Sequence, residues 1–224
     1  MSSVYDLRTF TPSADGDPVK FPTAPYEGAA SYFDAYAEEI FRAGKTVEPD
    51  AFDQAAAILL DAYTCGATLF SCGNGGSASI ANHMQCDHLK GVRTTTDLTP
   101  RVHSLSTNVE LLTAIANDLG YENIFVHQLE SQSRPGDVLI AVSSSGASAN
   151  IVRALTWARE HELRTIAVTG FDGGAAKTIA DVAIHVKSTN YGVVEDMHQA
   201  IMHALAQYIR QSRMSAEAII SAVF

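Results

Sequence analysis

The segment from Ala67 to Asp87 restricts most strongly which fold this chain can adopt. Ala67–Cys72 is a short apolar run typical of a buried strand, and Gly73–Gly76 interrupts it. Ser77 follows at the position of a helix N-cap. Glycines let the backbone approach a ligand closely, and the free N–H groups of a helix start favour an anion. The segment therefore predicts a phosphate or carboxylate site. An ordinary glycine-rich turn is the alternative, because the spacing matches neither a P-loop nor a dinucleotide-binding motif.

A second segment repeats this arrangement. Asp137–Ser143 has the composition of a buried strand, and a turn rich in small hydroxyl side chains separates it from a helical pattern that begins at Ala149. In an open α/β sheet, ligands bind beyond the carboxyl ends of the strands, so both turns are expected to face one pocket. The four serines of the second turn suit a phosphate, because hydroxyl and N–H groups satisfy its oxygens. They are Ser143, Ser144, Ser145 and Ser148.

Strand-like and helix-like segments alternate along most of the chain, which predicts an α/β fold with a parallel sheet covered by helices on both faces. The predicted strands are Ala67–Cys72, Arg101–Ser106, Asp137–Ser143, Arg164–Thr169 and Val182–Val186. The predicted helices between and after them are 77–87, Val109–Asn117, Tyr121–Gln132, Ala149–His161, Gly174–Ile179 and Val193–Ser212. Two amphipathic helices, from Tyr26 to Gly44 and from Pro49 to Tyr63, precede the sheet. We expect a polar arm over residues 1–24, one domain over 25–213 and a short extension over 214–224.

The composition excludes several functional classes. The chain has 224 residues and a formal net charge of −10, with no cluster of lysine and arginine, which argues against a nucleic-acid-binding face. No apolar run approaches the roughly 18 residues that a membrane span needs, and the N-terminus lacks the pattern of a signal peptide. We therefore expect a cytoplasmic protein with neither a nucleic acid nor a membrane as partner.

Histidine and carboxylate side chains recur on two of the predicted helices. His83 and Asp87 are four residues apart, and Glu195 and His203 are eight apart, so each pair shares a helix face. Such groups suit general acid–base catalysis or metal binding, although acidic helices also carry pairs of this kind without any function.

Four motifs together resemble a known family. They are CGNGGSA from Cys72, AIANDLGYENIF from Ala114, SSSGAS from Ser143 and TGFDGG from Thr169, in the family's order. The chain resembles the sugar isomerase (SIS) domain family from about Phe52 to Gln211, and within it the phosphoheptose isomerases. The resemblance implies a flavodoxin-like α/β/α sandwich with a five-stranded parallel sheet. It also implies a homotetramer with sites between subunits, in which the N-terminal helices serve self-association.

The resemblance further implies the reaction and its residues. An aldose–ketose isomerase would convert sedoheptulose 7-phosphate to D-glycero-D-manno-heptose 7-phosphate through an enediol, with Asp87 and His203 as base and acid. One zinc ion per chain would bind His83, Asp87, Glu195 and His203. The substrate-binding residues would be Asn74, Gly75, Gly76, Ser77, Asn117, Asp118, Ser143, Ser144, Ser145 and Ser148.

The chain departs from the family pattern at several positions. Asp87 stands where the family has Glu, and Glu195 where it has Gln, so both remain oxygen ligands. Counting forward from Asn74 aligns Asp87 with the family's catalytic Glu, whereas counting back from Leu89 aligns His88 with it, so the helix contains a one-residue insertion. We prefer Asp87, because it shares the helix face of His83 and His88 does not. Gly192 and Val193 replace an Asp and an Arg, which bears on the choice of sugar.

Two alternative functions remain. The first is an isomerase of another sugar phosphate. The second is a non-catalytic SIS-domain protein, similar to those that associate with the bacterial replication initiator, for which an acid–base set is not required. Retention of His83, Asp87 and His203 favours the enzyme.

Overall fold

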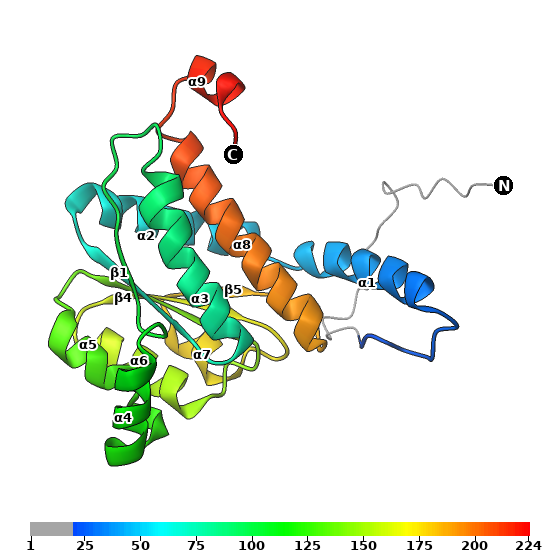
Figure 1. Cartoon of the computed structure of the whole chain (residues 1–224), viewed down its shortest axis with the longest axis horizontal. Helices are drawn as coiled ribbons and strands as arrows, with labels where there is room; N and C mark the ends of the chain where they lie inside the picture. The colour runs from blue at the N-terminus through cyan, green and yellow to red at the C-terminus, as the bar shows by residue number, and fades with distance from the viewer. Residues whose placement is uncertain (1–19) are drawn as a thin grey trace.

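The computed structural model describes residues 20–224, which form a five-stranded parallel sheet covered by helices (Figure 1). The strands are β1 (Thr68–Gly73), β2 (Arg101–Ser104), β3 (Val138–Ser143), β4 (Arg164–Thr169) and β5 (Val182–His185). They lie in the order β2-β1-β3-β4-β5, and every neighbouring pair is parallel. The predicted three-layer α/β/α fold with a five-stranded parallel sheet is confirmed.

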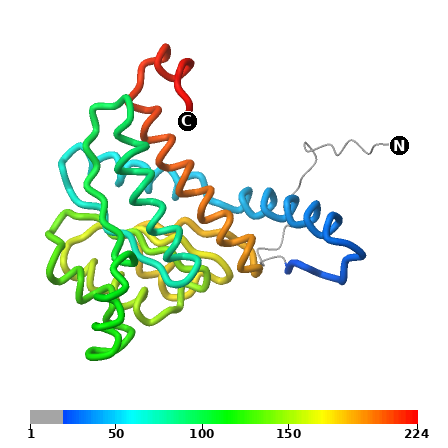
Figure 2. The backbone as a smooth tube through the Cα atoms, viewed as in Figure 1, coloured from blue at the N-terminus to red at the C-terminus, as the bar shows by residue number. Residues whose placement is uncertain are grey.

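The helices lie on both faces of the sheet (Figure 2). They are α1 (Ala29–Gly44), α2 (Pro49–Cys65), α3 (Gly76–Cys86), α4 (Val109–Leu119), α5 (Val126–Gln132), α6 (Ala149–Glu160), α7 (Gly174–Ile179), α8 (Tyr191–Gln211) and α9 (Ala216–Ser221). Short 3-10 and π-helical segments add η3 (Tyr121–Asn123) and η2 (Asp87–Val92). The predicted single helix over 121–132 is therefore η3 followed by α5.

Alternation along the strands divides the core into two halves. Val138, Ile140 and Val142 of β3 pack in the cluster that contains α2, α3 and α8 residues. Leu139 and Ala141 pack in the other cluster, under α5, α6 and α7. Successive strand side chains point to opposite faces, so a strand buried on both sides is apolar at every position. This explains why β3 is a continuous apolar run.

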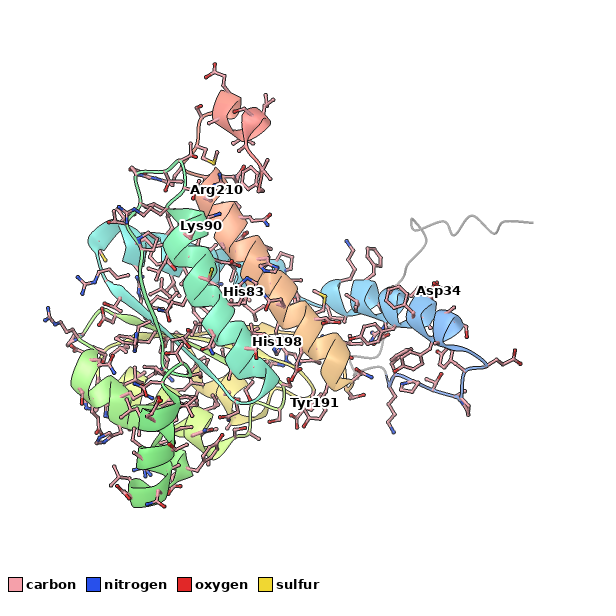
Figure 3. All side chains as sticks on the ribbon, viewed as in Figure 1. Asp34, His83, Lys90, Tyr191, His198 and Arg210 are labelled. Atoms are coloured by element: carbon pink, nitrogen blue, oxygen red, sulfur yellow. The ribbon has the colours of Figure 1, made fainter. Side chains whose placement is uncertain are left out.

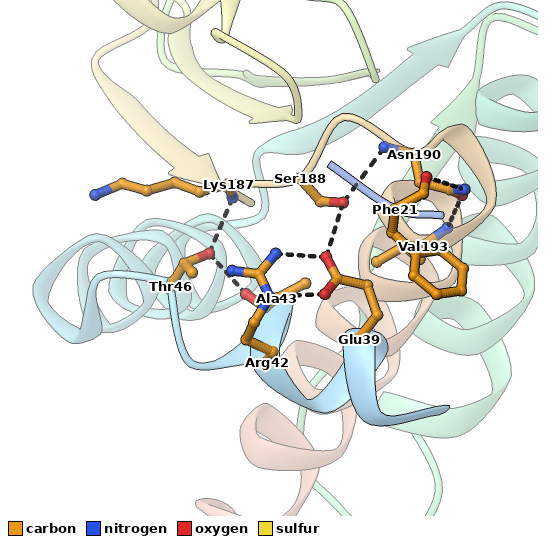
Figure 4. A network of polar contacts seen from close by, with 9 residues as sticks. All are labelled: Phe21, Glu39, Arg42, Ala43, Thr46, Lys187, Ser188, Asn190 and Val193. Atoms are coloured by element: carbon orange, nitrogen blue, oxygen red, sulfur yellow. Dashed lines mark hydrogen bonds and ion pairs between the residues drawn. The ribbon is translucent and has the colours of Figure 1, made fainter. Parts of the chain in front are cut away.

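The segment before the sheet is anchored on α8 and on the loop that precedes it (Figure 4). Glu39 is only 7% exposed; it pairs with Arg42, and Ser188 donates to its carboxylate over 3.5 Å. Phe21 packs among Tyr26, Tyr32 and Tyr36. Residues 20–24 of the predicted polar arm thus include an anchored aromatic side chain, whereas residues 1–19 of that arm lie outside the described part of the chain.

The strand order places the two predicted ligand turns side by side. β1 pairs with β3 in a register that sets Gly73 beside Val142, so the turns that follow both strands leave the same edge of the sheet at neighbouring positions. The connections from β1 and β3 run to opposite sides of the sheet at this point, which is where open α/β sheets form their ligand crevices. Among the described residues, no helix is long and apolar enough to cross a membrane.

Candidate functional site

The glycine turn after β1 starts α3, with the N-cap two residues earlier than predicted. The helix begins at Gly76, and its N-cap is Gly75 with φ 55° and ψ −123°, a conformation that favours glycine. The prediction of Ser77 as N-cap is therefore wrong, because Ser77 already lies in the first turn, where it is 4% exposed. Ser106, which the sequence did not single out, supports this turn. Its hydroxyl donates to the Gly73 carbonyl over 2.9 Å and accepts from the Gly73 N–H over 3.2 Å.

The serine turn after β3 orders its own hydroxyl groups. Ser143 Oγ accepts from Gly146 N–H over 3.1 Å, and Ser145 Oγ accepts from Ala147 N–H over 3.3 Å. Since both oxygens act as acceptors, their hydroxyl hydrogens are free to donate to an anion. Ser148 is the N-cap of α6 and forms no side-chain cap bond. Ser144 Oγ is buried without a hydrogen-bond partner among residues 20–224.

We call the glycine turn and the serine turn together the cradle, comprising Gly75, Gly76, Ser77, Ser143, Ser144, Ser145 and Ser148. The cradle lies at the starts of α3, which has 11 residues, and α6, which has 12. Helix starts present unpaired N–H groups and the positive end of the helix dipole, so the cradle is suited to an anion with several oxygens.

Asn74 of the glycine turn is bonded to two residues that the sequence analysis did not single out. Asn74 and Asn150 exchange two amide hydrogen bonds of 2.9 Å each, which ties the glycine turn to the start of α6. Tyr121 Oη donates to Asn74 Oδ1 over 2.8 Å. The only signal in the sequence is that Asn150 lies two residues after the serine turn. Asn117 and Asp118 are exposed at the end of α4, where Asn117 donates to Asp118 over 2.7 Å, three residues before Tyr121.

A second polar group lies further along α3, where it packs beside α8 (Figure 3). His83 Nε2 is 3.2 Å from Asp87 Oδ1, and His203 Nε2 is 3.3 Å from Asp87 Oδ2. The ligand atoms of all three residues lie within 4.8 Å of one another. We call His83, Asp87 and His203 the histidine–aspartate group. Its side chains are 48%, 23% and 42% exposed respectively, so the group faces the surface of this single chain.

The helix changes its pitch at this group. From Asp87 to Val92 it is a π-helix, whose wider turn accommodates one extra residue. A π-helical turn is one way in which a helix can accommodate the one-residue insertion expected here. His88 turns into the core, where it is fully buried with Nδ1 2.5 Å from Tyr63 Oη, and burial lowers its pKa to about 4. The structure thus brings Asp87, and not His88, to His83 and His203.

Glu195 is not brought into the histidine–aspartate group. It lies eight residues before His203 on α8, which separates the two by roughly 12 Å along the helix axis. Its carboxylate lies against the start of α3, where a Cβ on Gly76 would overlap it. Gln199, one turn before His203, is closer: its Nε2 atom lies 3.0 Å from His203 Nε2. The fourth ligand expected at Glu195 is therefore absent from the group that the described residues form.

A pocket of about 430 Å³ opens beside Asp87 and His203. Two cationic residues, Lys90 and Arg210, line its far end, together with Gln207 and Phe224. Arg210 is 9% exposed; it donates to the carbonyl oxygens of Thr94 and Val223, and its guanidinium lies 4.8 Å from the centre of the Phe224 ring. The C-terminal segment therefore forms one wall of this pocket.

The arrangement combines two kinds of chemistry along α3. The cradle at the starts of α3 and α6 can hold an anion, and the histidine–aspartate group, formed where the end of α3 and η2 meet α8, offers two imidazole nitrogens and a carboxylate. Such a set can transfer protons, and it is also a suitable donor set for a divalent metal ion.

Comparison with known proteins agrees with this architecture. The SIS domain model matches residues 31–170. A phosphoheptose isomerase of Rhodospirillum rubrum is 37% identical over 166 residues, covering 74% of this chain and 87% of the relative. Solved phosphoheptose isomerases from Neisseria gonorrhoeae and Francisella tularensis superpose with TM-scores of 0.73 and 0.74 at 31% and 30% identity, covering 81% of this chain and 96% of theirs. The chain belongs to the SIS domain family and is a homologue of the phosphoheptose isomerases, which are sugar-phosphate isomerases.

Proposed function

We propose that this protein interconverts sedoheptulose 7-phosphate and D-glycero-D-manno-heptose 7-phosphate. One observation carries the proposal: α3 starts in the cradle, and its last turn and the π-helical segment after it bring His83 and Asp87 to His203 of α8. Gly76 and His83 are seven residues apart and Gly76 and Asp87 eleven, which corresponds to about 10 and 16 Å along the axis. An open-chain sugar phosphate carries its phosphate and its carbonyl at opposite ends, so a seven-carbon chain suits two sites so far apart.

The residues of this chain divide the reaction between them. The cradle holds the phosphate, with Ser143, Ser145 and Ser148 donating hydroxyl hydrogens to its oxygens. An aldose–ketose isomerisation moves a proton between adjacent carbons and another between their oxygens, so it requires a base and an acid. Asp87 and His203, 3.3 Å apart, are proposed as this pair. Lys90 and Arg210 line the same pocket and would favour the negative charge that develops on the enediolate.

The histidine–aspartate group also suits a metal ion, because its nitrogen and carboxylate donors converge within 4.8 Å. His83, Asp87 and His203 would hold zinc or a similar divalent ion, with Gln199 as a further ligand after a side-chain rotation. Bound there, the ion would polarise the carbonyl or enediolate oxygen of the substrate. Asp87 and His203 keep their proton-transfer role in this account, since each presents further lone-pair or N–H positions.

We further propose that the protein is a homotetramer. Helix α1 projects from the body of the molecule and exposes apolar side chains, with Phe33 67% and Phe41 43% exposed (Figure 1). An exposed apolar helix face is a typical protein–protein contact surface. Light scattering of the full chain at micromolar concentration is expected to give four times the mass of one chain, and a monomer would contradict this part of the proposal.

The deciding experiment measures turnover and metal content on the same preparation. The purified protein is expected to convert sedoheptulose 7-phosphate to the aldose and to contain close to one zinc-like ion per chain by elemental analysis. Turnover of another ketose or aldose phosphate from a panel, without turnover of the heptose, would replace the substrate and keep the reaction. A folded protein that turns over no sugar phosphate would favour the non-catalytic SIS-domain alternative.

A further inference from the structure

Three segments expected to contact the substrate meet at the side chain of Asn74. The first is the glycine turn that contains Asn74, the second is the serine turn followed by Asn150, and the third is the end of α4 followed by Tyr121. Resting on the proposed function, we propose that Asn150 and Tyr121 are positioning residues, which set the geometry of the substrate site through Asn74. Asn74 itself then acts as a junction, and its amide oxygen accepts no hydrogen bond from the substrate.

A backbone N–H establishes the direction of every hydrogen bond in this junction. The N–H of Ile151 donates to Asn150 Oδ1 over 2.9 Å, so that atom is an acceptor. It also faces Asn74 Nδ2 at 2.9 Å, which must therefore be the amide nitrogen of Asn74. The second bond then runs from Asn150 Nδ2 to Asn74 Oδ1, and the Tyr121 hydroxyl has to donate to the same oxygen.

These directions use the acceptor capacity of Asn74 completely. An amide oxygen has two lone pairs, and those of Asn74 Oδ1 receive Asn150 Nδ2 and Tyr121 Oη. A sugar hydroxyl therefore has no lone pair on this oxygen left to donate to, and a substrate contact to Asn74 would have to use the second N–H of Nδ2. Asn150 is 1% exposed, so no substrate reaches it either, and removal of one partner leaves buried polar atoms unpaired.

The bonds from Asn150 and from Tyr121 to Asn74 support different parts of the site. The amide pair joins the glycine turn to the start of α6 and thereby sets the distance across the cradle. The phenol joins the glycine turn to η3 and the end of α4, where Asn117 and Asp118 lie. Tyr121 is 57% exposed, so its removal leaves the core unchanged. Loss of Asn150 is thus expected to weaken phosphate binding, whereas loss of the Tyr121 hydroxyl is expected to affect only the sugar.

The first test measures the affinity of the full-length protein for inorganic phosphate by calorimetry. Asn150→Ala is expected to weaken this affinity about tenfold, as the loss of two hydrogen bonds at an ordered site implies. Thr156→Ala is the control in the same helix, because it removes the hydrogen bond that the exposed Thr156 hydroxyl donates to the Val152 carbonyl, away from the cradle. Ser145→Ala is the reference for loss of a direct phosphate donor. If Ser145→Ala lowers the affinity for inorganic phosphate and Asn150→Ala does not, the inference is overturned and the proposed function is kept. If the wild-type protein has no affinity for phosphate, both are overturned.

The second test separates a junction from a ligand. If Asn74 acts through Asn150, then Asn74→Ala, Asn150→Ala and the double variant lose similar amounts of kcat/KM for sedoheptulose 7-phosphate. Additive losses, with the larger one in Asn74→Ala, would show that Asn74 contacts the substrate and would overturn its assignment as a junction. Thermal unfolding of each variant establishes that the comparison is made on folded protein.

The third test uses a variant that removes one oxygen atom. Tyr121→Phe is expected to raise KM for sedoheptulose 7-phosphate by about threefold to tenfold and to leave both kcat and the affinity for inorganic phosphate unchanged. Tyr208→Phe, at an exposed tyrosine of α8, is the control. An unchanged KM in Tyr121→Phe would overturn its positioning role, and it would do so even if Asn150→Ala did not fold.

Discussion

The two ends of the candidate site are built in different ways. In the cradle, the hydroxyl oxygens of Ser143 and Ser145 accept hydrogen bonds from backbone N–H groups of their own turn. Ser77, Ser143 and Ser144 are buried. In the histidine–aspartate group, His83 and His203 are about half exposed. Within the described chain, the polar contacts of these two histidines are with Asp87 and Gln199.

This difference indicates what each end needs in order to work. The cradle is preorganised, because its turn geometry follows from the strands and helices that it connects. The histidine–aspartate group has few restraints of its own, so a bound metal ion, a substrate or a neighbouring subunit would have to complete it. The following variants test this contrast.

The largest effect is expected at Asp87. Asp87→Asn removes the proposed base and the carboxylate shared by both histidines, and general acid–base catalysis typically contributes about a hundredfold to ten-thousandfold in rate. We expect kcat for sedoheptulose 7-phosphate to fall by about a thousandfold and the metal content to fall with it, while inorganic phosphate still binds. A parallel loss of phosphate affinity would contradict the separation of the two ends.

The neighbouring residue is expected to give the opposite result. His88→Ala removes a buried side chain that bonds to Tyr63, so it leaves a cavity and an unpaired hydroxyl. The free energy of unfolding should fall by about 2–4 kcal/mol in a denaturant titration. Metal content and kcat of the folded protein are expected to stay near the wild-type values, and a metal-free, inactive variant would transfer the role of Asp87 to His88.

A smaller effect is expected in the cradle. Ser145→Ala removes one charge-assisted hydrogen bond to phosphate, worth about 1.5–3 kcal/mol. KM for the sugar phosphate and the dissociation constant of inorganic phosphate should both rise by about tenfold to a hundredfold. Ser131→Ala, at an exposed serine of α5, serves as the control. Equal affinities in the two variants would remove Ser145 from the phosphate site.

The smallest effect on activity is expected at His198, a core residue that belongs to neither the cradle nor the histidine–aspartate group. Here the expected change is in the pH dependence of the unfolding free energy. His198 is fully buried on α8, and burial lowers its pKa to about 4 from the ordinary value of 6.5. Between pH 6.5 and 4 the unfolded chain therefore takes up this proton while the folded chain does not. The free energy of unfolding consequently decreases as the pH is lowered through that window. His198→Leu is expected to reduce the slope of unfolding free energy against pH by about 1.4 kcal/mol per pH unit. An unchanged slope in equilibrium denaturation would show that His198 is protonated in the folded state.

Periodicity and turn chemistry were sufficient to predict most of the fold. The apolar runs that form β1 and β3 and the glycine turn that follows β1 are local signals. They depend on the pleat, the helix repeat and glycine's freedom at positive φ. The N-cap of α3 was predicted two residues late, at Ser77, because Gly75, rather than a hydroxyl side chain, caps the helix.

The pairing of His83 with Asp87 was also readable from the sequence, because a helix brings residues four apart onto one face. Their convergence with His203 was an expectation from the family resemblance, and only the packing of α3 against α8 shows it here. The position of Glu195 beside Gly76 could not be predicted, because sharing a helix face with His203 does not establish which part of the neighbouring helix a residue meets.

The sequence by itself therefore determined the elements, their alternation and the kinds of side chain at each turn, all of which follow from interactions between residues close along the chain. Tertiary structure decided which of those turns lie together. The pairing of β1 with β3, the π-helical turn that directs Asp87 outward and His88 inward, and the junction of Asn74 with Asn150 and Tyr121 each join distant residues or depend on what surrounds a helix. Contacts across such separations are set by packing of the whole sheet and its helices, which no local pattern encodes.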